Sequence, residues 1–313
     1  MKWAFELFVD ILASNLLTAH TIVLSQSIVA SNRNDRQVSF GTETTVTARV
    51  ITTTMPTVSN DGVSLYYERD GEGTDGTVVF VSEAGLGGWS WGWQHAGLPG
   101  SFDRIVWDLR GTGRSDTPQG PYSLETLASD LEAVLSDSGI RSAHVVAAGL
   151  GGAVALTAAR TGTRIESLVL VGTGASEAEF DLDPLFAPPT DRDRLYTSIE
   201  SVLSEAFLDE QPEVVEGIVD WRADGDATTE GWDAQVEALE GYDAADWLVE
   251  ITQPALVFHG TDDELVPVDA GRRLSSGLPR GEFVPLEGTG HLAWIERSSE
   301  VNDRLLGFLE SLD

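Results

Sequence analysis

The segment that most constrains the fold is the short run from His144 to Leu156. It begins with apolar residues typical of a buried strand and passes through glycines at 149, 151 and 152. It then becomes a run of small residues typical of a helix. A strand that turns sharply into a helix is the start of a βα unit, and such units build parallel sheets. The segment therefore predicts a sheet with helices packed on its faces.

The rest of the chain repeats this alternation of strand and helix. Further strands are expected at 62–68, 77–81, 104–107, 165–171, 255–258 and 282–286. Helices are expected at 89–97, 123–139, 150–161, 268–276 and 298–311. The alternation predicts the α/β class, with a doubly wound and mostly parallel sheet.

Residues 176–250 interrupt the alternation. They are acidic and give helical stretches at 194–208, 211–222 and 230–249, with no strand among them. We expect a helical cap inserted into a core that consists of 55–175 and 251–313.

Residues 1–54 differ from the remainder in charge. They hold four cations and four carboxylates, so the whole net charge of −32 lies in 55–313. One interpretation is a mis-extended start, with Met55 as the true initiator of a cytoplasmic protein. The other is a membrane anchor, because Ile11 to Ala30 is an uncharged stretch long enough to cross a bilayer. The first is preferred, because Glu6 and Asp10 stand where a signal peptide carries positive charge.

The composition excludes several classes of partner and chemistry. There is no cysteine, which excludes disulfides and thiolate sites. The strong negative charge argues against nucleic acid, which needs a basic face. Nine tryptophans and regular apolar runs indicate a folded chain rather than a disordered acidic one. The acidic surface resembles that of proteins from salt-accumulating halophiles. No spacing typical of a metal site stands out.

Four motifs in order carry a resemblance to a known family. They are the loop Asp108–Ser115, the strand–turn–helix at 147–152, the loop Gly260–Pro267, and the run Gly288–His291. From Val58 to Leu312 the chain resembles the α/β-hydrolase superfamily, in particular its capped enzymes for esters, lactones and C–C bonds. The resemblance implies the predicted fold, a small-molecule substrate and no cofactor.

The resemblance also implies roles for individual residues. Asp263, with Asp262 as the alternative, takes the place of the acid that orients a histidine, and His291 takes the place of the proton shuttle. The oxyanion hole would use the backbone amide of Leu150 and a second amide near Gly85.

Two departures from the family pattern put the usual chemistry in doubt. The nucleophile elbow has the pattern G-x-S-x-G, but Gly149 stands at the serine position. Without a side chain there, no acyl-enzyme can form at 149, and Ser82 is an alternative nucleophile. The family's usual His-Gly pair is replaced by Glu83-Ala84. Glu83 is either a pocket carboxylate that acts as a general acid or base, or one more acid of an acidic protein.

Aromatic and histidine residues near these motifs have plainer interpretations. Trp89 and Trp91 follow the oxyanion loop, and one of them is expected to line a pocket while the other packs in the core. His144 and His259 are expected to be core histidines at strand ends.

Three functions remain open from the sequence. The first is an enzyme that uses Asp263–His291 as a general base without a serine. The second is a ligand-binding or sensor protein on the hydrolase scaffold, and the third is a scaffold for protein contacts. The substrate and the oligomeric state have no readable signature.

Overall fold

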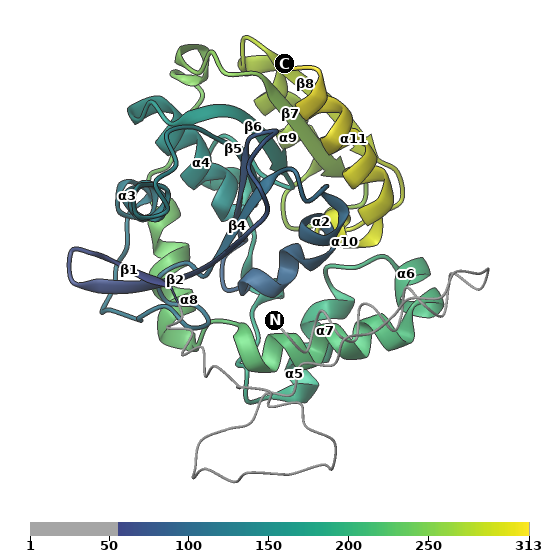
Figure 1. The fold of residues 1–313 in the computed structure, drawn as a ribbon. Helices are drawn as coiled ribbons and strands as arrows, with labels where there is room; N and C mark the ends of the chain where they lie inside the picture. Colours follow the sequence, from purple (N-terminus) through teal and green to yellow (C-terminus); the bar gives the residue numbers. More distant parts are fainter. Residues whose placement is uncertain (1–55, 313) are drawn as a thin grey trace, which may run out of the picture. The chain divides into compact units, whose positions relative to one another are not determined.

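The computed structural model describes residues 56–312, which form one eight-stranded sheet in the order β1-β2-β4-β3-β5-β6-β7-β8 (Figure 1). The strands are β1 (Thr57–Asn60), β2 (Val63–Asp70), β3 (Thr77–Val81), β4 (Asp103–Trp107), β5 (Ala143–Ala148), β6 (Ile165–Val171), β7 (Ala255–Gly260) and β8 (Gly281–Leu286). β2 pairs antiparallel with β1 and β4, and all other pairs are parallel. The predicted fold class is confirmed.

Helices surround the sheet. The α-helices are α2 (Gly92–Gly97), α3 (Leu124–Asp137), α4 (Leu150–Thr161), α5 (Arg192–Glu200), α6 (Glu205–Glu210), α7 (Pro212–Gly225), α8 (Thr229–Val236), α9 (Val268–Gly277), α10 (Ala293–Glu296) and α11 (Ser298–Glu310). Single 3-10 turns are η1 (Gly88–Trp91), η2 (Glu177–Glu179), η3 (Asp183–Leu185), η4 (Glu237–Leu239) and η5 (Leu248–Glu250).

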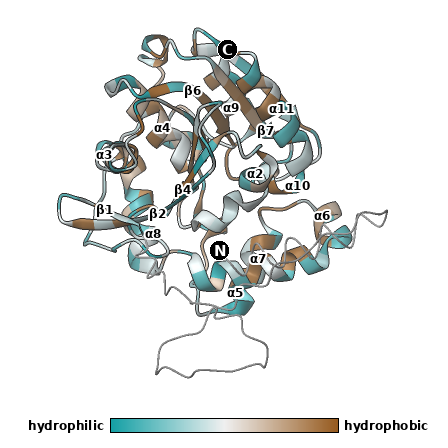
Figure 2. Ribbon diagram, viewed as in Figure 1, coloured by the Kyte–Doolittle hydropathy of each residue, from teal (hydrophilic) through white to brown (hydrophobic). Residues whose placement is uncertain are grey.

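The hydrophobic core lies along the central strands. Every residue of β3, β5 and β7 is buried, because helices cover both faces of the sheet. Figure 2 shows the apolar residues gathered on the inner strands and on the inward faces of the helices. α3 packs on α4, α9 packs on β7 and β8, and α11 packs on α2.

The turn between β5 and α4 depends on glycine. Gly149 has φ 49° and ψ −116°, a conformation that side chains with a Cβ rarely adopt. Gly151 brings the first turn of α4 against β3 so closely that a Cβ would lie 2.6 Å from the carbonyl oxygen of Val81. The sharp turn therefore directs the backbone amide of Leu150 towards the edge of the sheet.

Three details of the sequence prediction were wrong. β1 was not predicted, because its residues are exposed or half-buried and give no apolar signal. The predicted helix 194–208 is two helices, α5 and α6, because Ser204 caps a new start by accepting a hydrogen bond from the backbone N–H of Phe207. The predicted helix 230–249 is α-helical only in α8. The two 3-10 turns η4 and η5 follow, and Gly241, with φ 73°, lies between them.

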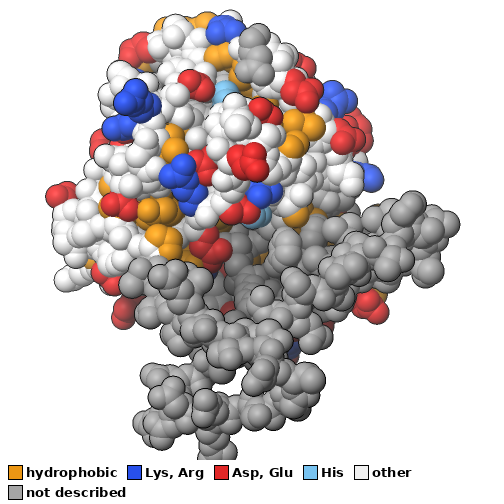
Figure 3. Space-filling model, viewed as in Figure 1, with side chains coloured by type: hydrophobic (Ala, Val, Ile, Leu, Met, Phe, Trp, Pro, Cys, Tyr) orange, Lys and Arg blue, Asp and Glu red, His pale blue; other side chains and the backbone are white. Residues whose placement is uncertain are grey.

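Between β6 and β7 the described chain contains helices and turns and no strand, apart from one isolated bridge between Ser176 and Asp243. The expectations for residues 1–54, including the uncharged stretch 11–30, lie outside the described residues. None of the helices within 56–312 is both long and apolar enough to cross a membrane. Figure 3 shows acidic side chains spread among fewer basic ones on the face in view.

Candidate active site

Four sequence-predicted residues meet at one edge of the sheet. Glu83 follows β3, Gly149 follows β5, Asp263 follows β7 and His291 follows β8. These strands are parallel, so their carboxyl ends lie at the same edge, where α/β proteins bind ligands. The side chains of Glu83, Asp263 and His291 are buried.

Asp263 orients the imidazole of His291. Its Oδ1 accepts hydrogen bonds from the backbone N–H groups of Leu265 and Val266, both at 2.9 Å. Its Oδ2 lies 2.9 Å from Nδ1 of His291. Asp262, the alternative, is exposed and makes no contact with the imidazole. The structure thus pairs Asp263 with His291.

Glu83 completes a hydrogen-bonded chain with His291 and Asp263. Its Oε2 lies 2.9 Å from Nε2 of His291. Its Oε1 accepts hydrogen bonds from the backbone N–H of Leu150 at 2.9 Å and of Ala84 at 2.5 Å. One carboxylate therefore hydrogen-bonds to the imidazole through Oε2 and to two converging backbone amides through Oε1.

The expectation that the second amide belongs to Gly85 needs correction. The backbone N–H of Gly85 donates instead to Oε1 of Gln235, at 2.7 Å, and the amide that converges with Leu150 is that of Ala84. The cause is Gln235 of α8, whose side chain reaches the loop after β3 and accepts the hydrogen bond of the Gly85 amide.

Gly149 and Glu83 share one space. An ideal Cβ on Gly149 would lie 1.2 Å from Oε2 of Glu83 and 2.0 Å from its Cδ. The carboxylate therefore fills the position that a side chain at 149 would occupy. The backbone of Gly149 is fixed by two hydrogen bonds, from its N–H to Val171 and from Oγ1 of Thr173 to its carbonyl.

The charges of the three groups are strongly coupled. Burial alone would lower the pKa of His291, but the carboxylates of Asp263 and Glu83 outweigh it and raise this pKa to about 10. Burial would raise the pKa of Asp263, yet His291 and His259 together hold it below its ordinary value. His291 therefore lies between the carboxyl groups of Asp263 and Glu83, and its raised pKa favours the imidazolium at neutral pH.

Helix α8 lies against the loop that carries Glu83. Gln235 also donates through Nε2 to the carbonyl of Arg110 and to Oγ1 of Thr112, both at 2.7 Å. The indole of Trp232 lies against Gly85, where an added Cβ would be 2.6 Å from the ring. These contacts place α8 directly beside the candidate site.

The two tryptophans occupy different environments. Trp91 is fully buried and stacks on Trp294, with ring centroids 5.4 Å apart. It is a core residue, and Trp294 in turn lies edge-on to the imidazole of His291. Trp89 lies against the cap, where its Nε1 donates to Asp226 at 2.8 Å. Among the described residues, no hydrogen bond or ring contact joins either indole to Glu83 or His291.

The remaining candidates take no direct part in this cluster, except His259. Oγ of Ser82 is buried and has no hydrogen-bond partner among the described residues, so no base contacts it. His144 bonds to Ser167 at its strand. His259 is buried with Nε2 3.3 Å from Oδ2 of Asp263, so it supports the acid from behind.

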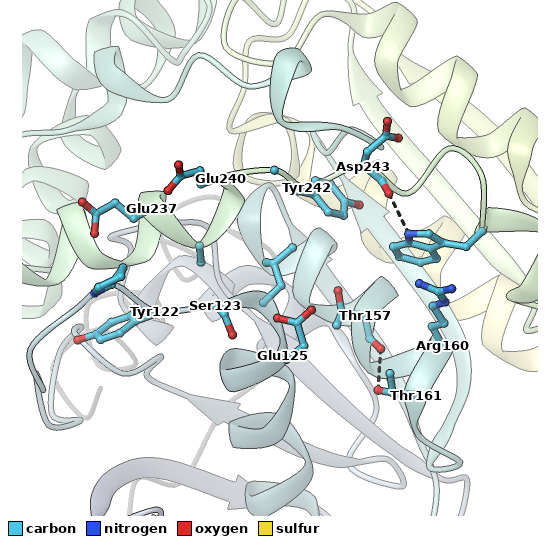
Figure 4. A pocket seen from close by; sticks show the side chains of 15 residues that line it. Tyr122, Ser123, Glu125, Thr157, Arg160, Thr161, Glu237, Glu240, Tyr242 and Asp243 are labelled. Carbon is cyan, nitrogen blue, oxygen red and sulfur yellow. Dashed lines mark hydrogen bonds between the residues drawn. The ribbon is translucent and has the colours of Figure 1, made fainter.

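A separate groove of about 430 Å³ lies between α3, α4 and the segment that follows α8 (Figure 4). Arg160 stacks over the ring of Trp247 at its edge, 4.8 Å from the centroid. The groove does not include Glu83, Asp263 or His291. Within 56–312 no group of three or more His, Cys, Asp or Glu side chains is arranged to hold a metal ion.

Sequence reasoning missed two features of the site. The sequence indicated that Glu83 could be a pocket acid. It did not indicate that the carboxylate of Glu83 lies in the space that a side chain at 149 would fill. The two substitutions together were the available signal. It also missed Gln235, whose role depends on how the cap sits on the core, and no local pattern in 230–249 marks it.

Comparison with known proteins gives a consistent result. A family model described as alpha/beta hydrolase fold matches residues 78–298. The chain is 30% identical over 274 residues to the non-heme chloroperoxidase CPO-A1 of Kitasatospora aureofaciens, covering 80% of this chain and 98% of the relative. It is 26% identical to 3-oxoadipate enol-lactonase 2 of Acinetobacter baylyi, covering 79% and 93%.

Solved structures show the same likeness. The enol-lactonase from Burkholderia xenovorans superposes with a TM-score of 0.73 at 26% identity, over 82% of this chain and all of that one (100%).

Proposed function

The chain belongs to the α/β-hydrolase family, and on this premise we propose that it is a hydrolytic enzyme for a small organic ester, lactone or ketone that works without a serine nucleophile. Asp263 and His291 serve as the general-base pair. The observation that carries the proposal is the 2.9 Å hydrogen bond between Oδ2 of Asp263 and Nδ1 of His291. It leaves Nε2 directed at Oε2 of Glu83, whose Oε1 accepts the hydrogen bonds of the Leu150 and Ala84 amides.

The chemistry follows from this arrangement. Asp263 holds the imidazole in one orientation and stabilises its cation, so Nε2 can donate its proton to a leaving group and, once deprotonated, take a proton from water. Amides that converge on one point stabilise an oxyanion that develops there. The enzyme class is supported by relatives named as an enol-lactonase and a chloroperoxidase.

A panel of short esters, lactones and β-diketones tests the proposal. We expect turnover by the full chain and its loss in His291→Ala, with His144→Ala as the matched control, since His144 is also a buried histidine and contacts Ser167 and Glu166 of β6. Turnover that survives His291→Ala would remove His291 from the mechanism. Absence of turnover in the parent chain would reject the hydrolytic function itself.

One observation favours a second candidate, a ligand-binding or sensor protein on the same scaffold. Oε1 of Glu83 already occupies both amides, so a carbonyl that binds there has to displace it. A protein of this kind would bind one of the panel compounds, measured by calorimetry, without converting it, and His291→Ala would leave the affinity for a neutral ligand nearly unchanged.

A further inference from the structure

The loop after β3 makes a tight turn that carries Glu83 and the Ala84 amide. The backbone N–H of Leu86 donates to the carbonyl of Glu83 at 3.1 Å and closes the turn. Gly85 is its third residue and has φ 73°, a conformation that glycine adopts without strain at this position of a turn. The place of the Ala84 amide therefore depends on what holds the turn.

The segment that runs from the end of α7 into α8 holds this turn from outside. The backbone N–H of Ala227 donates to the carbonyl of Gly85 at 2.8 Å. The N–H of Gly85 donates to Oε1 of Gln235 at 2.7 Å, and the N–H of Gly87 donates to Oδ1 of Asp226 at 3.3 Å. Among the described residues, these are the hydrogen bonds that the backbone from Ala84 to Gly87 makes outside its own loop.

Asp226 binds the loop at two points through one oxygen. Its Oδ1 also accepts a hydrogen bond from Nε1 of Trp89 at 2.8 Å. Its Oδ2 lies 2.6 Å from Nε of Arg222, and the side chains of Arg222 and Asp226 are only 2% and 3% exposed. Because little water reaches them, these bonds are electrostatically stronger than bonds at the surface. The ion pair therefore fixes the carboxylate, and the carboxylate fixes the loop.

The two backbones also fit closely against each other. An ideal Cβ on Gly87 would lie 2.5 Å from the carbonyl oxygen of Gly225. An ideal Cβ on Gly225 would lie 3.2 Å from Cδ1 of Trp89. Glycine at both positions therefore lets the end of α7 lie directly on the loop.

We propose that Asp226 is a positioning residue for the oxyanion site: by holding the loop after β3, it keeps Glu83 and the Ala84 amide aligned with the Leu150 amide. The proposal deepens the proposed function and rests on it in one respect, namely that these two amides stabilise a developing oxyanion. Among the described residues, no hydrogen bond joins Asp226 to Glu83 or to either amide. Asp226 thus acts through the loop.

The Leu150 amide reports the position of the loop. Oε1 of Glu83 accepts the N–H of Ala84, which lies on the loop, and the N–H of Leu150, which is the first residue of α4. A shift of the loop moves Glu83 but not α4, so it lengthens the 2.9 Å hydrogen bond from Leu150. The reporter therefore lies on an element that Asp226 does not contact.

A matched pair of double variants isolates the contact between Asp226 and the loop. Arg222→Met stands in both, because a buried arginine without its carboxylate would itself destabilise the fold. Arg222→Met with Asp226→Asn keeps an oxygen for Gly87 and Trp89. Arg222→Met with Asp226→Leu has a similar volume and no acceptor. Loss of the ion pair is common to both, so the difference between them measures the acceptor.

Amide NMR of the full chain, labelled with nitrogen-15 and without substrate, reads out this difference. In the leucine variant we expect the amide of Gly87 to exchange at least about 5-fold faster than in the asparagine variant, as for the loss of one buried hydrogen bond. The Leu150 amide proton should shift upfield as its hydrogen bond lengthens. A Leu150 resonance at the same position in both variants would overturn the inference, because the loop then keeps its place without Asp226.

Trp89→Phe is a milder second test for the case that the leucine variant does not fold. It removes the indole donor and leaves the pair of Arg222 and Asp226 intact. We expect a smaller upfield shift of the Leu150 amide proton relative to the parent chain, and an unchanged resonance would count against the proposal.

Kinetics on the panel of esters and lactones separates this inference from the proposed function. The leucine variant should have a kcat about 10-fold below that of the asparagine variant and a KM within about 3-fold, because the amides act on charge that develops in the transition state. Equal kcat values despite a displaced Leu150 resonance would reject Asp226 as a positioning residue. A displaced resonance with no turnover by the parent chain would reject the proposed function and leave the hold of Asp226 on the amide pair standing.

Discussion

At the scale of residues, Gly149 and Glu83 form one unit, because either a side chain at 149 or the glutamate at 83 fits, but not both. The conformation of Gly149 would strain any larger residue. The overlap with Oε2 of Glu83 adds a clash to that strain. A serine at 149 is therefore expected to destabilise the fold while Glu83 keeps its present position.

We expect Gly149→Ser to lower the free energy of unfolding by more than about 3 kcal/mol, the sum of backbone strain and the clash. Gly139→Ser is the matched control, because Gly139 has φ 71° but open space around its Cβ. It should cost only about 1 kcal/mol. Urea unfolding of both variants measures the difference.

The added substitution Glu83→Ala should recover part of the loss in Gly149→Ser. A coupling of at least about 1 kcal/mol between the two changes is expected, as for residues in direct contact. Additive effects in the double-variant cycle would mean that the two positions do not share the space described.

Protonation of His291 links stability to pH. Its pKa in the folded protein is about 10, above the value of about 6.5 for an unfolded histidine. The folded state thus binds the extra proton between these values, and its stability falls as pH rises from about 6.5 to 10, by up to about 1.4 kcal/mol per pH unit.

Denaturant unfolding between pH 6 and 10 checks this slope, with His291→Gln as the comparison. The variant should lose the histidine contribution and give a flatter profile in this window. Identical slopes for the two proteins would show that His291 has an ordinary pKa.

At the scale of elements, α8 controls the loop between β3 and η1 through one side chain. Gln235 joins the Gly85 amide to the Arg110 carbonyl and the Thr112 hydroxyl. Gln235 is fully buried, so water cannot replace the hydrogen bonds that it makes to these partners. This side chain therefore ties α8 to the loops that follow β3 and β4.

Gln235→Leu should therefore lower the free energy of unfolding by about 1–3 kcal/mol, because it leaves three buried polar groups without partners. Gln119→Leu is the control, since Gln119 is exposed, and should change stability by less than about 0.5 kcal/mol. Chemical denaturation of the two variants decides; equal effects would contradict the role given to Gln235.

At the scale of the whole molecule, the net charge of −32 dominates. Arginine–carboxylate pairs such as Arg192 with Glu216 and Asp220 neutralise it only locally. Self-repulsion over this surface opposes folding, and concentrated salt reduces it because the screening length falls to about 3 Å at 1 M.

The melting temperature should thus rise by roughly 5 °C or more between 0.1 M and 2 M KCl. Over this range the screening length falls from about 10 Å to below 3 Å. Scanning calorimetry at pH 7 measures it. A melting temperature that is independent of KCl would argue against a surface adapted to high salt.

The sequence was sufficient for the sheet because buried parallel strands are continuous apolar runs, as in β3 and β5. The family resemblance named Asp263 and His291, and the structure brings the two side chains within 2.9 Å of each other. The sequence could not identify the contacts of Gln235 with Gly85 and Arg110, because these residues are more than 100 positions apart in the sequence and meet only in the folded chain.

The overlap of Gly149 with Glu83 also has a consequence for inheritance. A glutamate placed as Glu83 is here is compatible only with glycine at 149, because a Cβ at 149 would overlap its carboxylate. Among related chains, we expect the two positions to covary, with no chain that combines glutamate at 83 with a residue larger than glycine at 149.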